Sequence, residues 1–185
     1  MTESLDRVAI LELFEELSRR LSLRGATADL FVVGGGAIAL AYDARRATRD
    51  LDAMFAPTDI VRSVVADIAE DRGLAEDWLN DAVKGFLPGE DPDARIFFES
   101  DSLRVDVASP RYLLAMKLMS ARPGADIDDI RTLYRICGFT TVEEGLDVVT
   151  RAFPNSRMLP KTEYLLGEIV EDMKTRAASE EPDRA

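Results

Sequence analysis

Two aspartates separated by a single residue are the chemically most informative feature of this sequence. Asp50 and Asp52 flank Leu51 in a short segment that ends in apolar residues. Side chains alternate along an extended strand, so both carboxylates would point to the same face of a sheet. Carboxylates held this close repel each other unless a cation lies between them. Because carboxylate oxygens are good ligands for Mg²⁺ or Mn²⁺, the pair predicts a divalent-metal site.

A run of three glycines lies just upstream of this pair. Gly34, Gly35 and Gly36 follow an apolar segment at 30–33 and precede a segment of helical composition at 37–42. The N–H groups of such a turn, together with the N-terminus of the helix, can bind a phosphate group. The spacing matches neither the dinucleotide-binding fingerprint nor a P-loop, and a tight turn without a ligand is the alternative. Next to the aspartates, the run predicts a site for a nucleotide and its metal.

A third carboxylate lies in a second strand-like segment. Asp106 stands between apolar neighbours in residues 103–107. If that strand adjoins the strand expected at 51–55, three carboxylates converge on one face, where two divalent ions about 4 Å apart could activate an attacking oxygen and neutralise a leaving phosphate. The alternative is an edge-strand aspartate paired with Arg104 or Arg111. The sequence thus predicts Asp106 as a third metal ligand, with an ion pair as the competing interpretation.

Composition narrows the chemistry that these residues can perform. The chain has 185 residues, no histidine, one cysteine and a formal net charge of −12. Without histidine there is no Ser-His-Asp triad and no histidine-ligated zinc, so the chemistry depends on carboxylates, lysine and hydroxyls. The negative charge argues against broad binding of nucleic acid, although a local basic patch stays compatible with it. We expect a cytoplasmic protein with no membrane partner, because no apolar run approaches the roughly 18 residues that span a bilayer.

The elements that must position these residues follow from hydrophobic periodicity and turn signals. We expect an α+β fold, with a small mixed sheet flanked by helices and a helical C-terminal segment. Residues 1–109 form the core with its N-terminal helix, residues 110–177 pack on it as helices, and residues 178–185 form a frayed tail. The expected strands are 30–33, 51–55, 95–99 and 103–107, and the expected helices are 3–24, 37–42, 58–72, 110–121, 126–137, 141–152 and 160–177.

Local signals refine the ends and faces of three of these helices. Val8 and Ile60 are expected on the apolar faces of their helices. Thr58 is a candidate N-cap, and Thr141 and Glu144 have the spacing of a capping box.

The combined pattern resembles a known group of enzymes. Gly35 and Gly36, a gap of 13 residues, then Asp50 and Asp52 and a later strand aspartate resemble the motif of the polymerase-beta-like nucleotidyltransferase superfamily. The preceding Arg-Ala-Thr-Arg segment at 46–49 makes the chain similar to the AbiEii/MenT-type nucleotidyltransferase toxins. So does the later segment 113–122, which is followed by Asp126 and Asp129.

This resemblance implies a function. It implies a short mixed sheet flanked by helices, and transfer of a nucleotide from a nucleoside triphosphate (NTP) with magnesium. In the toxin families the acceptor is typically the 3′ end of tRNA, and the modification blocks aminoacylation. A cognate antitoxin opposes the enzyme.

The resemblance also implies roles for individual residues. Asp50 and Asp52 match the metal ligands, and Gly35 and Gly36 match the cradle of the triphosphate. Lys117 and Asp126 also match. Lys117 corresponds to a lysine near the phosphates, and Asp126 corresponds to an acidic residue in the next helix.

Simpler interpretations of the helical residues stay open. Lys117 could lie at the helix surface with its ammonium in water, although a lysine point charge suits a triphosphate. Arg122 and Asp126 could form a structural ion pair. Asp129 is expected to orient a neighbouring arginine rather than to bind metal.

Three arginines precede the strand of the aspartate pair. Arg45, Arg46 and Arg49 could bind RNA phosphate groups locally on this acidic chain, and Arg49 is placed among the nucleotide-binding residues. The alternative is salt bridging to nearby acids.

Two other functions remain beside the tRNA-directed toxin. The same chemistry could modify a small molecule of the aminoglycoside kind, or a protein, and the net acidity suits a cationic acceptor. Alternatively, the chain could be a nucleotide-binding module without turnover.

Overall fold

The computed structural model describes residues 4–43, 46–120 and 126–180. The chain divides into two compact units. The first, the sheet unit, comprises Met1–Leu87 and Asp91–Ser109. The second, the helical unit, comprises Pro88–Glu90 and Pro110–Ala185.

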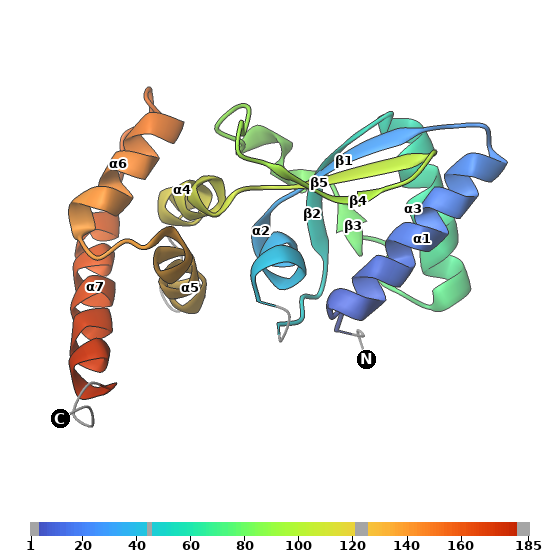
Figure 1. The fold of residues 1–185 in the computed structure, drawn as a ribbon. Coiled ribbons are helices and arrows are strands. Elements are labelled where there is room, and N and C mark those ends of the chain that lie inside the picture. Colours follow the sequence, from blue (N-terminus) through green and yellow to red (C-terminus); the bar gives the residue numbers. More distant parts are fainter. Residues whose placement is uncertain (1–3, 44–45, 121–125, 181–185) are drawn as a thin grey trace. The chain divides into compact units, whose positions relative to one another are not determined.

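The sheet unit contains a five-stranded mixed sheet in the order β3-β2-β1-β5-β4 (Figure 1). The central strand β1 pairs antiparallel with β2 on one side and parallel with β5 on the other. At the edges, β3 pairs parallel with β2, and β4 pairs antiparallel with β5. The expected α+β class with a small mixed sheet is confirmed. The strands are β1 (Ala28–Val32), β2 (Leu51–Ala56), β3 (Leu79–Asn80), β4 (Arg95–Glu99) and β5 (Leu103–Val107).

One face of this sheet is covered by helices and the other is open to solvent. Leu30, Ala53 and Val105 on the three inner strands are at most 1% exposed, whereas their strand neighbours are exposed or half-buried. Helix α1 (Arg7–Leu23) packs against α3 (Thr58–Arg72) and contacts β5, and α3 contacts β2. We call the opposite face, which carries the half-buried and exposed side chains, the open face.

Four expectations for α1 and α3 were wrong in detail, namely the start of α1 at residue 3, the burial of Val8 and of Ile60, and the Thr58 cap. Helix α1 begins at Arg7 because the Asp6 carboxylate accepts a hydrogen bond from Ala9 N at 2.9 Å and caps it. Val8 is 64% exposed and Ile60 37% exposed, because each lies beside the buried stripe of its helix rather than in it. Thr58 is the first helical residue, not the cap, and its hydroxyl donates to the carbonyl of Phe55.

The glycine run forms a helical turn instead of only ending the strand. Helix α2 is Gly34–Ala37, so the helix begins three residues before the expected start at 37. It continues as a π-helical segment, Ile38–Tyr42, in which Asp43 N donates to Ile38 O at 2.8 Å. Wide turns of this kind are frequent at functional sites.

The described residues of the helical unit form four helices. Helix α4 packs against α5 and α6, and α7 contacts both α5 and α6. The capping box is confirmed, since Thr141 Oγ1 accepts from Glu144 N and the Glu144 carboxylate accepts from Thr141 N. The helices are α4 (Pro110–Ser120), α5 (Ile127–Cys137), α6 (Val142–Ala152) and α7 (Pro160–Glu180).

Helix α7 extends beyond the expected end at 177. It runs to Glu180, so the first three residues of the expected tail are helical. Its last turns contain an ion pair between Arg176 Nε and Asp172 Oδ2 at 3.0 Å, and Ser179 Oγ donates to Arg176 O at 2.8 Å. Residues 181–185 of the tail lie outside the described residues.

Tight packing at Gly145 leads to a stability prediction for the helical unit. Tyr134 of α5 is fully buried, and burial raises the pKa of its hydroxyl. A Cβ on Gly145 of α6 would lie 1.9 Å from that hydroxyl oxygen. We expect Gly145→Ala to lower the free energy of unfolding by about 2 kcal/mol, measured by urea denaturation. The matched control is Gly167→Ala in α7, where a Cβ meets nothing within 4 Å and the change should stabilise by about 0.5–1 kcal/mol. Equal effects of the two changes would contradict this packing argument.

Candidate active site at the open face

Strand β2 positions Asp52 between two neighbouring strands. Asp52 pairs in register with Asn80 of β3, and its carbonyl accepts from Val33 N at 2.9 Å. It is half-buried and alternates with buried Leu51 and Ala53, so its carboxylate lies on the open face. Backbone hydrogen bonds of Asp52 to Val33 and of Leu51 to Trp78 therefore hold this part of β2 from both sides.

Asp50 lies immediately before β2 and is fixed by a different contact. The hydroxyl of Thr48 donates to the Asp50 carbonyl at 2.9 Å. Thr48 is paired through two backbone hydrogen bonds, of 2.7 and 2.8 Å, with Leu5, which is 3% exposed. Asp50 is half-buried, as Asp52 is, so both side chains are partly exposed to solvent. Hydrogen bonds to the carbonyl of each residue fix the backbone.

Gly34 brings the glycine turn against the Asp52 carboxylate. Its φ angle is +66°, a conformation that glycine adopts without strain. A Cβ at Gly34 would lie 2.9 Å from Asp52 Oδ2. The close approach therefore requires glycine at this position. Motif matching assigned the cradle to Gly35 and Gly36, and missed the glycine that contacts the aspartate.

The two glycines of the prediction have different surroundings. Gly36 is buried, and a Cβ there would lie 2.5 Å from Leu51 Cδ2, so its contact is with the core. Gly35 is half-buried, and a Cβ there would meet Thr48 Oγ1 at an ordinary 3.6 Å. The N–H groups of this first helical turn have no partner within the helix. They are the donors that a phosphate group would use.

This difference predicts opposite results for two alanine substitutions. We expect Gly36→Ala to destabilise the protein by about 1–3 kcal/mol, because the added methyl group overpacks fully buried Leu51. Gly35→Ala should leave the midpoint of thermal unfolding within a few degrees of the wild type. Thermal unfolding followed by circular dichroism measures both. A larger loss from Gly35→Ala than from Gly36→Ala would contradict the assigned packing.

Asp106 shares the open face with Asp52 but lies elsewhere on it. The two aspartates lie at different levels along β1. Asp106 pairs in register with Phe31, and Asp52 lies opposite Val33, whose N–H donates to the Asp52 carbonyl. Strand β1 lies between the two carboxylates. Arg104 donates to both oxygens of Asp106, from Nε at 2.9 Å and from Nη2 at 3.1 Å. This pairing raises the pKa of the Arg104 guanidinium.

The interpretation of Asp106 as an aspartate paired with Arg104 thus describes its contacts in this structure. Among the described residues, no three cysteine, aspartate or glutamate side chains gather closely enough to hold a metal ion. The roles of Asp50, Asp52 and Asp106 as metal ligands stay predictions.

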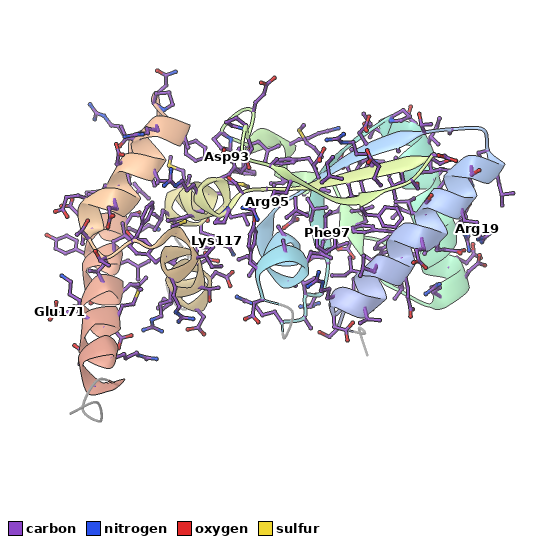
Figure 2. The ribbon with its side chains drawn as sticks, viewed as in Figure 1. Arg19, Asp93, Arg95, Phe97, Lys117 and Glu171 are labelled. Atoms are coloured by element: carbon purple, nitrogen blue, oxygen red, sulfur yellow. The ribbon has the colours of Figure 1, made fainter. Side chains whose placement is uncertain are left out.

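Lys117 and Asp126 meet in the helical unit. Lys117 Nζ of α4 lies 2.8 Å from Oδ1 of Asp126, the residue before α5, and 2.8 Å from Asp129 Oδ2 of α5 (Figure 2 labels the lysine). The three side chains are 12%, 0% and 4% exposed, respectively. The lysine is therefore a largely buried counter-ion for two carboxylates. Asp129, expected to orient an arginine, contacts this lysine.

The structure describes two of the three arginines that precede β2. Arg49 is exposed and Arg46 is half-buried. Arg45 and Arg122 lie outside the described residues. The nucleotide-binding role of Arg49 stays a prediction.

The fold and the site define a class of protein. The chain combines a small mixed sheet that has helices on one face with an aspartate pair at the start of β2. A glycine turn lies against the carboxylate of Asp52, and together these features form a nucleotidyltransferase-like core. The chain belongs to the DUF6036 family, nucleotidyltransferases of unknown function, whose family model matches residues 8–146. No curated protein and no solved structure matches the chain. No helix in the described part of the chain combines the length and apolar composition needed to cross a membrane.

Proposed function

We propose that this protein is a metal-dependent nucleotidyltransferase that transfers nucleotides from an NTP to the 3′ end of tRNA. It would act in the cytoplasm as the toxin of a toxin–antitoxin pair and block translation. The observation that carries the proposal is the contact between the glycine turn at Gly34 and the Asp52 carboxylate. Membership in a nucleotidyltransferase family supports the same class of reaction.

Asp50 and Asp52 fit the requirements of a magnesium or manganese site. Both are half-buried carboxylates, and oxygen ligands of this kind suit these hard cations. Mg²⁺ usually binds through one or two carboxylates together with substrate phosphates, and a site with two protein ligands fits that pattern. When bound, the metal would supply neutralisation of the phosphate charge that develops during transfer. Asp106, already paired with Arg104, is not needed for this arrangement.

The chemistry is a substitution at the α-phosphorus of the NTP. An acceptor hydroxyl oxygen forms a bond to this phosphorus, and the bond from the phosphorus to the bridging oxygen breaks. Pyrophosphate leaves with that oxygen, and the hydroxyl proton passes to solvent. The chain contributes the N–H groups of the glycine turn, which would hold the triphosphate, and the aspartates, which would hold its metal.

The choice of tRNA rests on the resemblance to the toxin families. The arginines that precede β2 support it, since Arg49 is exposed and can contact a phosphate of the acceptor or of the nucleotide. With a net charge of −12, binding of RNA would depend on a few local contacts rather than on the field of the whole protein. The proposed antitoxin would be a second protein that opposes transfer.

Label transfer tests the proposal directly. The purified protein is incubated with Mg²⁺, total tRNA and each of the four α-labelled NTPs. We expect label in tRNA with at least one NTP, and none when the terminal ribose diol of the tRNA has been oxidised with periodate. Labelling that survives this oxidation would place the modification elsewhere than the 3′ end. Lack of transfer with every NTP would refute the tRNA acceptor.

A cationic small molecule is the second candidate acceptor. The net charge of −12 favours a cation over RNA, and aminoglycoside-like compounds are polycations. The same incubation with an aminoglycoside mixture, or with protein extract, replaces the tRNA. Labelling of one of these and not of tRNA would favour that acceptor. Binding of triphosphate without transfer to any of them would indicate a non-catalytic module.

The toxin role has a separate cellular test. Expression of the protein should arrest growth, and co-expression of the product of the neighbouring gene should relieve the arrest. Asp52→Asn should remove the arrest at equal protein level. Arrest by that variant would show that toxicity does not come from nucleotide transfer.

A further inference from the structure

A row of four side chains crosses the open face of the sheet. The strand register places Met54, Phe31, Asp106 and Ile96 at one level, on β2, β1, β5 and β4 respectively. Met54 is 40% exposed and Ile96 is 50% exposed, while Phe31 and Asp106 are half-buried. We call these four residues the open-face row. In this row Asp106 lies between Phe31 and Ile96, and Met54 lies on the far side of Phe31.

The row continues the candidate active site along the strand. Asp52 and Met54 are two residues apart on β2 and share the open face, so they are separated by about 7 Å along the strand. Gly34, where the triphosphate would bind, lies against Asp52. A nucleotide that extends along β2 from this point carries its base toward Met54 and Phe31. Aromatic rings and thioethers are good stacking surfaces for bases because every base has a π-face.

Asp106 is oriented within this row by its neighbour. Arg104 donates one hydrogen bond to each carboxylate oxygen of Asp106 and so fixes the plane of the carboxylate. Each oxygen has a second lone pair, so the carboxylate can still accept another hydrogen bond. The Asp106 carboxylate is 25% exposed. A carboxylate beside a stacked base can accept a hydrogen bond from an exocyclic amino group, as it does from cytosine.

We propose that the open-face row binds the base of the donor NTP. The base stacks on Phe31 and Met54, and Asp106 accepts a hydrogen bond from its exocyclic amino group. The enzyme then prefers an NTP whose base carries an amino group over UTP, which has a carbonyl oxygen instead. This inference rests on the proposed function, and it gives Asp106 a role in base recognition instead of metal binding.

Binding to nucleotide analogues that cannot react tests this proposal. Isothermal titration of the full chain with Mg²⁺ compares α,β-methylene CTP, α,β-methylene UTP and inorganic triphosphate, which has no base. We expect the CTP analogue to bind at least about fivefold more tightly than the UTP analogue. Phe31→Leu keeps apolar bulk but removes the aromatic ring. It should weaken binding of both nucleotide analogues at least about fivefold and leave binding of inorganic triphosphate unchanged.

Asp106→Asn tests the amino-group contact separately. The amide side chain can both donate and accept, so this variant should bind the CTP and UTP analogues with similar affinity. Tyr164→Leu is the matched control for loss of an exposed aromatic ring, since Tyr164 is 79% exposed on α7. It should bind all three ligands as the wild type does. Thermal unfolding of each variant verifies that it is folded.

The outcomes separate this inference from the proposed function. If Phe31→Leu and Asp106→Asn both bind all three ligands with wild-type affinity, the proposed binding of the base by the open-face row is overturned. A loss in Phe31→Leu that extends equally to inorganic triphosphate would also overturn it, because the effect would then not involve the base. In both cases, triphosphate binding that is lost in Asp52→Asn would leave the proposed function standing. If the wild type binds no triphosphate with Mg²⁺, the proposed function fails and this inference fails with it.

Discussion

Asp52→Asn is expected to lower the rate of nucleotide transfer by about 1,000-fold. The amide side chain of this variant would lack the negative charge with which Asp52 holds a divalent cation, and the metal supplies several kcal/mol of stabilisation to the charged transition state. Each 1.36 kcal/mol corresponds to a factor of ten in rate, so a loss of about 4 kcal/mol gives the expected change. Initial rates of label transfer under saturating NTP measure it.

The asparagine side chain has nearly the same shape, so the fold should be unchanged. The amide nitrogen of asparagine would take the place of Asp52 Oδ2 beside Gly34, and the two atoms are similar in size. Asp29→Asn is the matched control, because Asp29 is an exposed aspartate on the open face of β1 and pairs in register with Ala56. It should transfer label at the wild-type rate. Retention of more than a tenth of the activity by Asp52→Asn would refute the assignment of Asp52 as a metal ligand.

Lys117→Met should lower the free energy of unfolding by about 3–5 kcal/mol. The lysine ammonium lies 2.8 Å from carboxylate oxygens of both Asp126 and Asp129, which are 0% and 4% exposed. Removing the lysine takes away a positive charge that pairs with two buried carboxylates, and loss of one partner of a buried ion pair is strongly destabilising. Methionine matches the length and apolar stem of lysine, so the change isolates the charge. Urea denaturation followed by circular dichroism gives the measurement.

Two further variants define the origin of that loss. Lys161→Met replaces an exposed lysine in the first turn of α7 and should change stability by less than about 0.5 kcal/mol. The triple change Lys117→Met, Asp126→Asn, Asp129→Asn also removes the two buried negative charges and should recover part of the stability. A destabilisation of Lys117→Met below about 1 kcal/mol would show that the lysine is not needed for the fold.

Most of the elements could be predicted from local patterns. Helix α3 has the predicted bounds because its apolar spacing is clear and Gly73, in the left-handed conformation, ends it. Strands β4 and β5 also have the predicted bounds, because each contains a short apolar segment. In contrast, β3 contains only Leu79 and Asn80, and two residues show no period. Its pairing with β2 comes from tertiary structure alone.

The sequence predicts on which face of the sheet the site residues lie, but not which residues lie next to them. Each of Asp52 and Asp106 alternates with apolar residues along its strand. The sequence therefore predicts that both lie on the face of the sheet opposite the core. Which strand lies between them and how far each is shifted depend on the sheet register, which no local pattern determines. Likewise, the positive φ angle of Gly34 distinguishes it from two identical neighbours only in the folded chain.

The ion-pair cluster of the helical unit shows the same limit. Motif matching selected Lys117 and Asp126 for chemistry, and both belong to one contact network. Their separation in the sequence does not reveal that α4 and α5 pack with these charges facing each other. Asp129 joins the network because it follows Asp126 by nearly one helical turn.

The bridge between Leu5 and Thr48 links the beginning of the chain to the segment that carries Asp50. Because these partners are distant in the sequence, the contact can form only after the intervening helix, strand and glycine turn have been brought together, at an entropic cost of loop closure. The backbone at Asp50 is therefore held by a contact between distant segments rather than by a local fold. A nascent or partly unfolded chain would carry the motif but lack this arrangement, so any activity of this protein depends on complete folding of its sheet unit.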